Sequence, residues 1–358
     1  MKAVSILLLD DEKMVVDSLR NLIELETEYI TFAETSPFKA LEILDNHMIN
    51  VIVTDYLMPG MDGIEFLLEA KKKITQATTI ILTGYAGKEN AVHAINEIGI
   101  YHYVEKPWDN DELLIIIKNA VERGDLLTEI SNKYKELKEA YVGTIYRLAT
   151  AAEAYDDSTF THVLRISLFS SELARLSGEN EDFCHTIKYA SMMHDIGKIG
   201  IPLDILNKED SLTVDEYKIV QKHTENGAVI LRNPENSLLK MAHDIALNHH
   251  EQWNGEGYPK GLHGDSIPKS ARIVAVADMF DALLSERSYK PNFLPGKVRG
   301  IIETEKGWHL DPVITGILLD NYEAFTKIYD DLSIIEGEDL SKILFNISSE
   351  PAVVVGSV

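Results

Sequence analysis

Histidine and aspartate residues gather in the C-terminal half of this chain at spacings that could hold metal ions. Eight of the 12 histidines lie between His162 and His263, and His194 stands directly before Asp195 at the end of an apolar helical pattern. Adjacent residues on one helix project about 100° apart, so this pair can approach two neighbouring ions while Asp195 bridges them. The candidate ligands are His162, His194, Asp195, His223, His249, His250 and Asp278.

Five histidines and two aspartates would form a mixed shell of imidazole and carboxylate ligands around two ions. That mixture is typical of transition metals rather than Ca²⁺, and we expect Fe or Mn, with Ni or Zn as alternatives. Two such ions can hold an in-line displacement at phosphorus, because one lowers the pKa of a bridging water and both stabilise the developing charge. We interpret His185, His243 and His263 as ordinary surface or core residues.

A second set of polar residues follows short apolar runs in the N-terminal third of the chain. Its members are Asp10, Asp11, Asp55, Thr83 and Lys106. A single aspartate after a strand is more often a helix cap than a ligand, but five such residues on successive runs point to one site. Three converging carboxylates suit Mg²⁺, which prefers hard oxygen ligands. The threonine and the lysine would then contact an incoming phosphoryl group.

The elements that must position this second set alternate between strands and helices. Amphipathic helical patterns over residues 13–25 and 37–45 separate runs that are typical of buried strands. The expected strands cover residues 5–9, 29–33, 50–55, 78–83 and 101–106. Such alternation predicts an α/β fold of the flavodoxin-like kind, with a doubly wound parallel sheet. Ligands bind such sheets at the carboxyl ends of the strands, where the polar set lies.

The first 120 or so residues resemble the receiver domain of two-component response regulators. The motifs that carry the resemblance are LLLDDE, TDYLMPGMDG, LTGYA and YVEKPW. The resemblance implies that Asp55 accepts a phosphoryl group from a cognate sensor histidine kinase. It further implies that Mg²⁺ binds to Asp10, Asp11 and Asp55.

The same resemblance gives roles to the remaining polar residues at the strand ends. Thr83 and Lys106 would contact the phosphoryl group, and a cis peptide bond between Lys106 and Pro107 would aim the ammonium at the site. Tyr103 would be the aromatic residue that switches position on phosphorylation. Ordinary packing of Tyr103 in the core is an equally good interpretation.

Residues 123–148 have the pattern of a long helix that continues the last helix of the receiver. Turn-forming residues are scarce there, and apolar residues recur in steps of four and three. The positions are Leu126, Ile130, Tyr134, Leu137, Tyr141, Ile145 and Leu148. We prefer to interpret this stripe as a two-stranded coiled coil that makes the protein a homodimer. The alternative is a helix that packs only against its own chain.

Beyond the connector the strand signals disappear. Successive helical patterns predict an all-α domain over residues 149–330, with a C-terminal extension over residues 331–358. The motifs MMHDIGKIGIP and HHEQWNGEGYP make residues from about 145 to 325 resemble an HD-GYP domain. That family is a subgroup of the HD phosphohydrolases and hydrolyses cyclic di-GMP.

The HD-GYP resemblance implies that all seven candidate ligands bind a metal pair. His194 and Asp195 would belong to the catalytic centre, and Lys198 would lie near the scissile phosphate. Arg287 would contact a substrate phosphate. We interpret the Gly-Tyr-Pro loop, residues 257–259, as shaping a turn beside the site or offering a surface to a partner.

Two departures from the family pattern bear on metals and substrate. Ser158 stands where some members have an acidic ligand for a third metal, so we expect two metals. Ser288 and Lys290 stand where the family often has Pro and Arg, which bears on substrate preference.

The composition narrows the choice of partners. A net charge of −24 argues against a DNA-binding output, because such domains need Lys and Arg to displace counterions from phosphate. The sequence contains no apolar run of about 18 residues, and its single cysteine, Cys184, cannot form an internal disulfide. We therefore expect a cytoplasmic protein with no membrane insertion.

Together these features predict a response regulator, with its receiver over residues 1–122, in which phosphorylation controls hydrolysis of cyclic di-GMP to pGpG, GMP or both. One alternative is the same reaction on 3′3′-cyclic GMP-AMP. A second is a catalytically silent module that binds a cyclic dinucleotide or a protein, although no ligand of the family pattern is missing. A diguanylate cyclase is a further candidate partner.

Overall fold

The computed structural model describes residues 3–74, 77–84, 99–153, 160–208, 210–232, 236–285 and 295–333. The chain divides into two compact units, Met1–Glu136 and Leu137–Val358. Ser158 and nearly all of the predicted C-terminal extension lie outside the described residues. The predicted domain boundaries at residues 122, 148 and 330 stay predictions.

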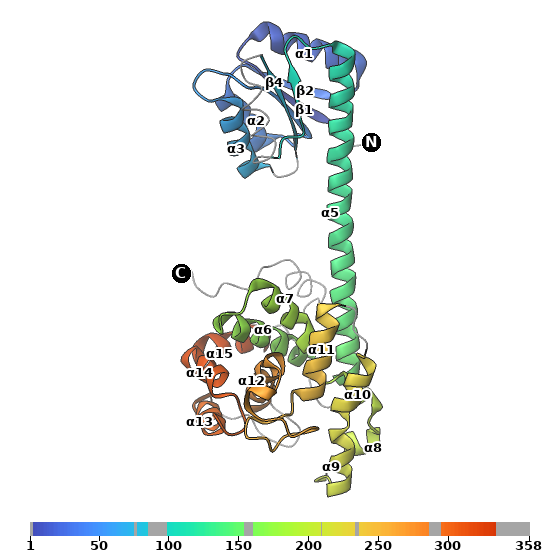
Figure 1. Ribbon diagram of the computed structural model, residues 1–358, viewed down its shortest axis with the longest axis vertical. Coiled ribbons are helices and arrows are strands. Elements are labelled where there is room, and N and C mark those ends of the chain that lie inside the picture. Colours follow the sequence, from blue (N-terminus) through green and yellow to red (C-terminus); the bar gives the residue numbers. More distant parts are fainter. Residues whose placement is uncertain are drawn as a thin grey trace. The chain divides into compact units, whose positions relative to one another are not determined.

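The first unit contains a five-stranded parallel sheet with the strand order β2-β1-β3-β4-β5 (Figure 1). The strands are β1 Ser5–Leu9, β2 Ile30–Glu34, β3 Val51–Asp55, β4 Thr78–Thr83 and β5 His102–Glu105. The order of the strands reverses between β1 and β3, and Asp10 and Asp55 lie at the carboxyl ends of these two strands. The predicted doubly wound α/β fold is therefore confirmed.

Helices cover both faces of this sheet, which explains why its strands are apolar throughout. Successive residues of a strand point to opposite faces. Ile6 and Leu8 of β1 accordingly lie in one core with α1 (Lys13–Glu26) and the first turns of α5 (Asn110–Glu153). Leu7 and Leu9 lie in the other core with α2 (Pro37–Asn46) and α3 (Gly63–Lys73).

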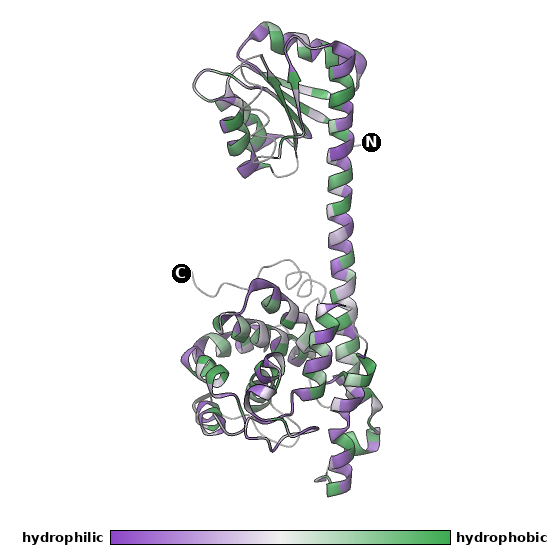
Figure 2. Ribbon diagram, viewed as in Figure 1, coloured by the Kyte–Doolittle hydropathy of each residue, from purple (hydrophilic) through white to green (hydrophobic). Residues whose placement is uncertain are grey.

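A single helix, α5 (Asn110–Glu153), contributes to both units. Leu113 near its start is buried in a core of the first unit, and Tyr146 near its end is buried in the core of the second. The long helix predicted over residues 123–148 is thus present. Hydrophobic residues recur along it between hydrophilic ones (Figure 2). Of the seven apolar positions in its stripe, Ile145 is buried and the other six are at least 40% exposed in the single chain.

The described part of the second unit is helical, as predicted. After α5 it contains α6 Phe160–Leu176, α7 Glu181–Ala190, η2 Ser191–Met193, η3 Ile196–Gly200, α8 Leu203–Leu206, α9 Val214–Gln221, α10 His223–Ile230, α11 Ser237–Asn248, η4 Gly264–Ser266, α12 Lys269–Leu284, α13 Pro295–Glu305, α14 Pro312–Asp320 and α15 Tyr322–Ser333. Helix α6 packs against α7, α12 and α15, and Phe169, Phe280 and Phe325 meet in the core between them. Among the helices that the structure describes, none has the length and apolar character to cross a membrane.

Candidate functional site

The carboxyl ends of the strands bring the acidic residues of the first unit together. Carboxylate oxygens of Asp10, Asp11 and Asp55 lie within 4.8 Å of one another. Lys106 Nζ lies 2.6 Å from Asp10 Oδ2 and 2.7 Å from Asp55 Oδ1. The peptide bond between Lys106 and Pro107 is cis, as predicted. Three carboxylates at this spacing could hold Mg²⁺, with the ammonium beside them.

The charges at this site depend on burial and on Lys106. Burial raises the pKa of Asp55, and Lys106 offsets part of that rise. Burial alone would lower the pKa of Lys106, but its hydrogen bonds to Asp10 and Asp55 raise it. Thr83 is buried at the end of β4, and Tyr103 is half-buried on β5. The phosphoryl-contact role of Thr83 and the switching role of Tyr103 stay predictions.

A cavity of about 330 Å³ in the second unit gathers most of the predicted metal ligands. Its volume falls within the range of small-molecule sites, about 300–1,000 Å³. The predicted residues that line it are His162, Asp195, Lys198, His223, His250 and Asp278. His194 and His249 are buried next to these residues.

Separate elements carry the ligands, so the site forms only when they pack. The positions are His162 on α6, His194 and Asp195 between η2 and η3, His223 at the start of α10, His249 and His250 after α11, and Asp278 on α12. Gly197 allows the close approach of η3 and α10, because a Cβ at this position would lie 1.9 Å from the carbonyl oxygen of His223. This contact explains why the HDIGK motif has a glycine.

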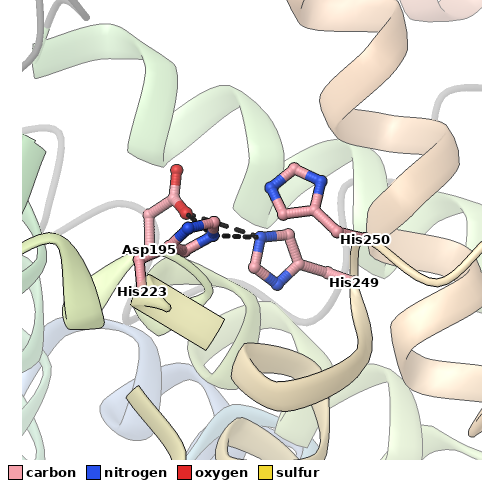
Figure 3. A group of neighbouring side chains, drawn as sticks. All are labelled: Asp195, His223, His249 and His250. Atoms are coloured by element: carbon pink, nitrogen blue, oxygen red, sulfur yellow. Dashed lines mark hydrogen bonds and ion pairs between the residues drawn. The ribbon is translucent and has the colours of Figure 1, made fainter. Parts of the chain in front are cut away.

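Histidine side chains converge on Asp195 (Figure 3). His223 Nε2 lies 3.2 Å and His249 Nε2 lies 3.4 Å from Asp195 Oδ1. His194 Nε2 lies 3.4 Å from the other oxygen, Oδ2. Ligand atoms of Asp195, His223, His249 and His250 all lie within 4.8 Å of one another. Each oxygen of Asp195 therefore has at least one imidazole nitrogen beside it.

Backbone carbonyl groups set the orientation of three of these rings. The Nδ1 atoms of His194, His223 and His249 each face a carbonyl oxygen of the preceding turn. The acceptors are Ser191, Val220 and Ile245, at 2.9, 2.7 and 3.0 Å. A carbonyl oxygen can only accept, so each Nδ1 donates a proton to it and Nε2 is the ring atom that faces the cluster.

His162 is oriented by a carboxylate instead. Asp281 Oδ2 lies 2.7 Å from His162 Nδ1, and Asp281 is held in turn by Arg165. Asp281 and Arg165 are buried, and hydrogen bonds from His162 and Arg165 outweigh burial and lower the pKa of Asp281. This arrangement leaves His162 Nε2 for the cluster, where Asp278 Oδ1 lies 3.8 Å away.

The electrostatics of the site centre on the anionic Asp195. Burial by itself would raise the pKa of this carboxyl, but Lys198 and His194 hold it well below its usual range. Burial would likewise lower the pKa of His194, yet Asp195 raises it to about 9. Burial beside His249 and His223 lowers the pKa of His250 well below its usual value. The centre of the cavity is therefore a place that attracts cations.

The loop that contains the Gly-Tyr-Pro motif packs against this cluster. The ring of Tyr258 stacks on His250, with centroids 4.9 Å apart. Gly257 is required by close packing, because a Cβ there would lie 2.3 Å from a backbone nitrogen. Glu251 is buried, and its two oxygens accept hydrogen bonds from two backbone N–H groups of the loop at 2.8 and 2.9 Å. The loop thus supports the ring of a candidate ligand.

The residues of the cavity fit two metal ions. His194 Nε2 and Asp195 Oδ1 are buried, and neither has a hydrogen-bond partner within the part of the chain that the structure describes. Imidazole lone pairs beside a buried carboxylate are the donor set of a transition metal. One group of ligand atoms comes from Asp195, His223, His249 and His250. A second group comes from His162, His194 and Glu153, a residue that the motifs do not include.

The structure thus brings together all seven predicted ligands and Lys198. Arg287, Ser288 and Lys290 lie outside the described residues. The three histidines that we interpreted as ordinary residues do not line the cavity. Sequence reasoning did not identify Glu153 or Asp281. For Asp281 there was one signal, because it lies three residues after Asp278 and therefore on the same face of α12.

Comparison with known families identifies both parts of the chain. A model of the response regulator receiver domain matches residues 6–118, and a model of the HD domain matches residues 147–314.

The chain is also similar to curated proteins over most of its length. It is 32% identical to the cyclic di-GMP phosphodiesterase response regulator RpfG of Xanthomonas campestris pv. campestris, over 92% of this chain and 91% of that protein. It is 31% identical to a cyclic di-GMP phosphodiesterase of Thermotoga maritima, over 91% of this chain and 92% of that protein. A 3′3′-cGAMP-specific phosphodiesterase 2 of Vibrio cholerae is 41% identical, but the match covers 57% of this chain and 39% of that protein.

Proposed function

Because this chain belongs to the cyclic di-GMP phosphodiesterase response regulators, in which a receiver domain precedes an HD domain, we propose that it hydrolyses cyclic di-GMP to pGpG, GMP or both. The observation that carries the proposal is the convergence of three histidines on Asp195 in a cavity that Lys198 also lines. Such a site can bind a phosphodiester and the cations that its hydrolysis needs.

Two transition-metal ions, held by the seven ligands, would supply Lewis acidity and a water of lowered pKa. We propose Fe or Mn for these positions and Mg²⁺ for the receiver. Asp195 provides the carboxylate between the two groups of ligands. Lys198, whose ammonium lies beside that carboxylate, binds the negative charge of the scissile phosphate. Tyr258 holds the ring of His250 in place by stacking on it.

The first test is the metal content and the cyclic di-GMP turnover of the purified chain. We expect about two metals per chain, and loss of both metal and turnover in His194→Ala and Asp195→Ala. His243→Ala is the matched control, because His243 is a partly exposed histidine outside the cavity. Metal binding without turnover, after reconstitution with Fe and Mn, would favour a silent binding module.

A second candidate substrate is 3′3′-cyclic GMP-AMP. The 41% identity to a cGAMP-specific enzyme favours it, and both molecules present the same phosphodiester to the cavity. Turnover of the two substrates measured side by side on one metal-loaded preparation separates the candidates. A higher kcat/KM for cyclic GMP-AMP would replace cyclic di-GMP as the substrate.

We propose that a sensor histidine kinase phosphorylates Asp55 in the cytoplasm and that α5 carries the change to the HD domain. The exposed stripe of α5 supports a homodimer, and a diguanylate cyclase is a second candidate partner. Beryllofluoride mimics the phosphoryl group on Asp55, so it should change turnover or oligomeric state in the wild type. In Asp55→Asn neither property should change. If neither property responds in the wild type, the regulatory half of the proposal is wrong.

A further inference from the structure

Glu153 is a buried carboxylate of the catalytic cavity that no motif of the sequence marks. It is the last residue of α5, its side chain is 4% exposed, and it lines the cavity together with Lys198. A buried carboxylate is costly unless positive charge faces it. Among the described residues that line the cavity, Lys198 supplies such charge with its ammonium, and the cations that the histidine cluster can hold would add to it.

The ammonium of Lys198 lies between two carboxylates. Its Nζ is 2.7 Å from Asp195 Oδ2 and 3.4 Å from Glu153 Oε2. Asp195 is also the residue on which three histidines converge. Metal ions held at Asp195 would repel the ammonium, because they would bring further positive charge next to the carboxylate that Lys198 contacts. Lys198 must then move away from Asp195, and Glu153 is a carboxylate within its reach.

The geometry points to Glu153 as the positioning residue of Lys198. This inference rests on the proposed function and deepens it. When the metals bind to Asp195, the ammonium shifts toward Glu153, which keeps Lys198 inside the cavity at the substrate phosphate. A ligand atom of Glu153 also lies within 4.8 Å of those of His162 and His194, so direct metal binding by Glu153 is the rival explanation.

A double-mutant cycle on the full chain tests this inference. Glu153→Gln, Lys198→Met and the double variant are compared with the wild type for metal content and for kcat/KM with cyclic di-GMP. We expect Glu153→Gln to keep two metals per chain and to lower kcat/KM about tenfold. In the Lys198→Met background the same change should lower kcat/KM by less than about twofold, because the positioned residue is already gone.

Two further readouts do not depend on turnover. The affinity of the metal-loaded chain for inorganic phosphate, measured by calorimetry, should fall about tenfold in Glu153→Gln but not further when Lys198→Met is added. Glu153→Asp keeps the carboxylate and should recover part of this affinity. If the wild type turns over neither cyclic dinucleotide, the proposed function fails, whereas these measurements still report on Glu153.

Glu172→Gln is the matched control, because it removes a buried glutamate charge that pairs with Arg175 at 2.6 Å outside the cavity. It should bind metal and phosphate like the wild type. Loss of a metal in Glu153→Gln would make Glu153 a ligand and overturn the inference. Equal losses of phosphate affinity in both backgrounds, with the metals retained, would show that Glu153 acts independently of Lys198 and would also overturn it.

Discussion

Asp281 orients His162 toward the cluster and is itself held by Arg165. Replacing it by Asn keeps the shape and removes the charge that faces His162 and Arg165. We expect Asp281→Asn to weaken metal binding about 10–100-fold, because His162 loses the partner that fixes its tautomer. Titration of the chelator-treated chain with Mn²⁺ measures this loss.

Asp311→Asn is the control for this variant. Asp311 is also buried, and it accepts a hydrogen bond from Arg272 Nη1 at 2.6 Å and caps α14. Asn keeps the cap but removes the charge that faces Arg272, which should lower the free energy of unfolding by about 1–3 kcal/mol and leave the affinity for Mn²⁺ unchanged. Equal loss of affinity in both variants would mean that general destabilisation, and not orientation of His162, causes the effect.

Four of the seven candidate ligands lie in the HDIGK and HHEQWNGEGYP motifs, whose combination is specific, and the family resemblance that these motifs carry supplied the other three. Asp281 could not be predicted in its role, because its partners His162 and Arg165 lie 119 and 116 residues away in the sequence. Their contact exists only after α6 and α12 have packed. Glu153 was missed for the same reason, since Lys198 lies 45 residues after it.

At the scale of elements, η3 and α10 can pack closely because Gly197 has no side chain at their contact. In Gly197→Ala the new Cβ would meet the His223 carbonyl oxygen and the Gly227 nitrogen, at 1.9 and 2.4 Å in the present geometry. We expect the two helices to separate, with loss of about 1–3 kcal/mol in the free energy of unfolding and weaker metal binding. Chemical denaturation and Mn²⁺ titration measure the two effects.

Gly300→Ala provides the comparison for Gly197→Ala. Gly300 lies inside α13, and in the described part of the chain no other element comes within 4 Å of the position that a Cβ would take there, so alanine meets no obstacle. Alanine is also the better helix former by about 1 kcal/mol. This variant should therefore be as stable as the wild type or more stable. A comparable loss in both variants would contradict the role given to Gly197.

The exposed stripe of α5 should form the dimer contact. Ile130→Glu with Leu137→Glu places charges on residues that are 64% and 68% exposed in the single chain. We expect the dimer to dissociate, because buried charges at such positions disrupt a coiled coil. Light scattering measures the mass. Asn132→Glu, on another face of the helix, should leave the dimer intact, and a wild-type monomer would exclude this contact.

Strand boundaries show how far an element can be predicted from its own residues. The predicted strand over residues 29–33 is Ile30–Glu34 in the structure. Its start is set by the neighbouring strand, because Ile30 pairs with Ser5 and its N–H donates to the carbonyl of Val4 at 2.8 Å. Such a partner is not visible in the local sequence, whereas the apolar character of the strand is.

For the whole molecule, metal removal should affect one unit and not the other. The second unit has its own core, and the first has separate cores on its sheet. We expect two calorimetric transitions. A transition-metal chelator in excess Mg²⁺ should lower one by about 5–10 °C, because a ligand at 100 times its Kd contributes about 2.7 kcal/mol.

Beryllofluoride with Mg²⁺ should raise the other transition, and Asp55→Asn should abolish that rise. A single transition that moves with either treatment would contradict the independence of the two units.

The presence of two units was predictable from the change of pattern along the chain. The division at residues 136 and 137 falls inside the uninterrupted helix α5, within the predicted connector, where no turn marks a boundary.

Because α5 is continuous, a signal that passes along it depends on the rotation of one end of the helix relative to the other about the helix axis. Each residue inserted into an α-helix turns all that follows by about 100° relative to all that precedes. Two residues inserted after Asn132 would turn the end at Glu153 by about 200°, whereas seven would bring it back to within about 20° of its original direction. We expect the response of turnover to beryllofluoride to survive the seven-residue insertion and to be lost with two. The receiver would then act on the HD domain by rotating α5 about its axis, and this rotation would change the position of Glu153 beside Lys198.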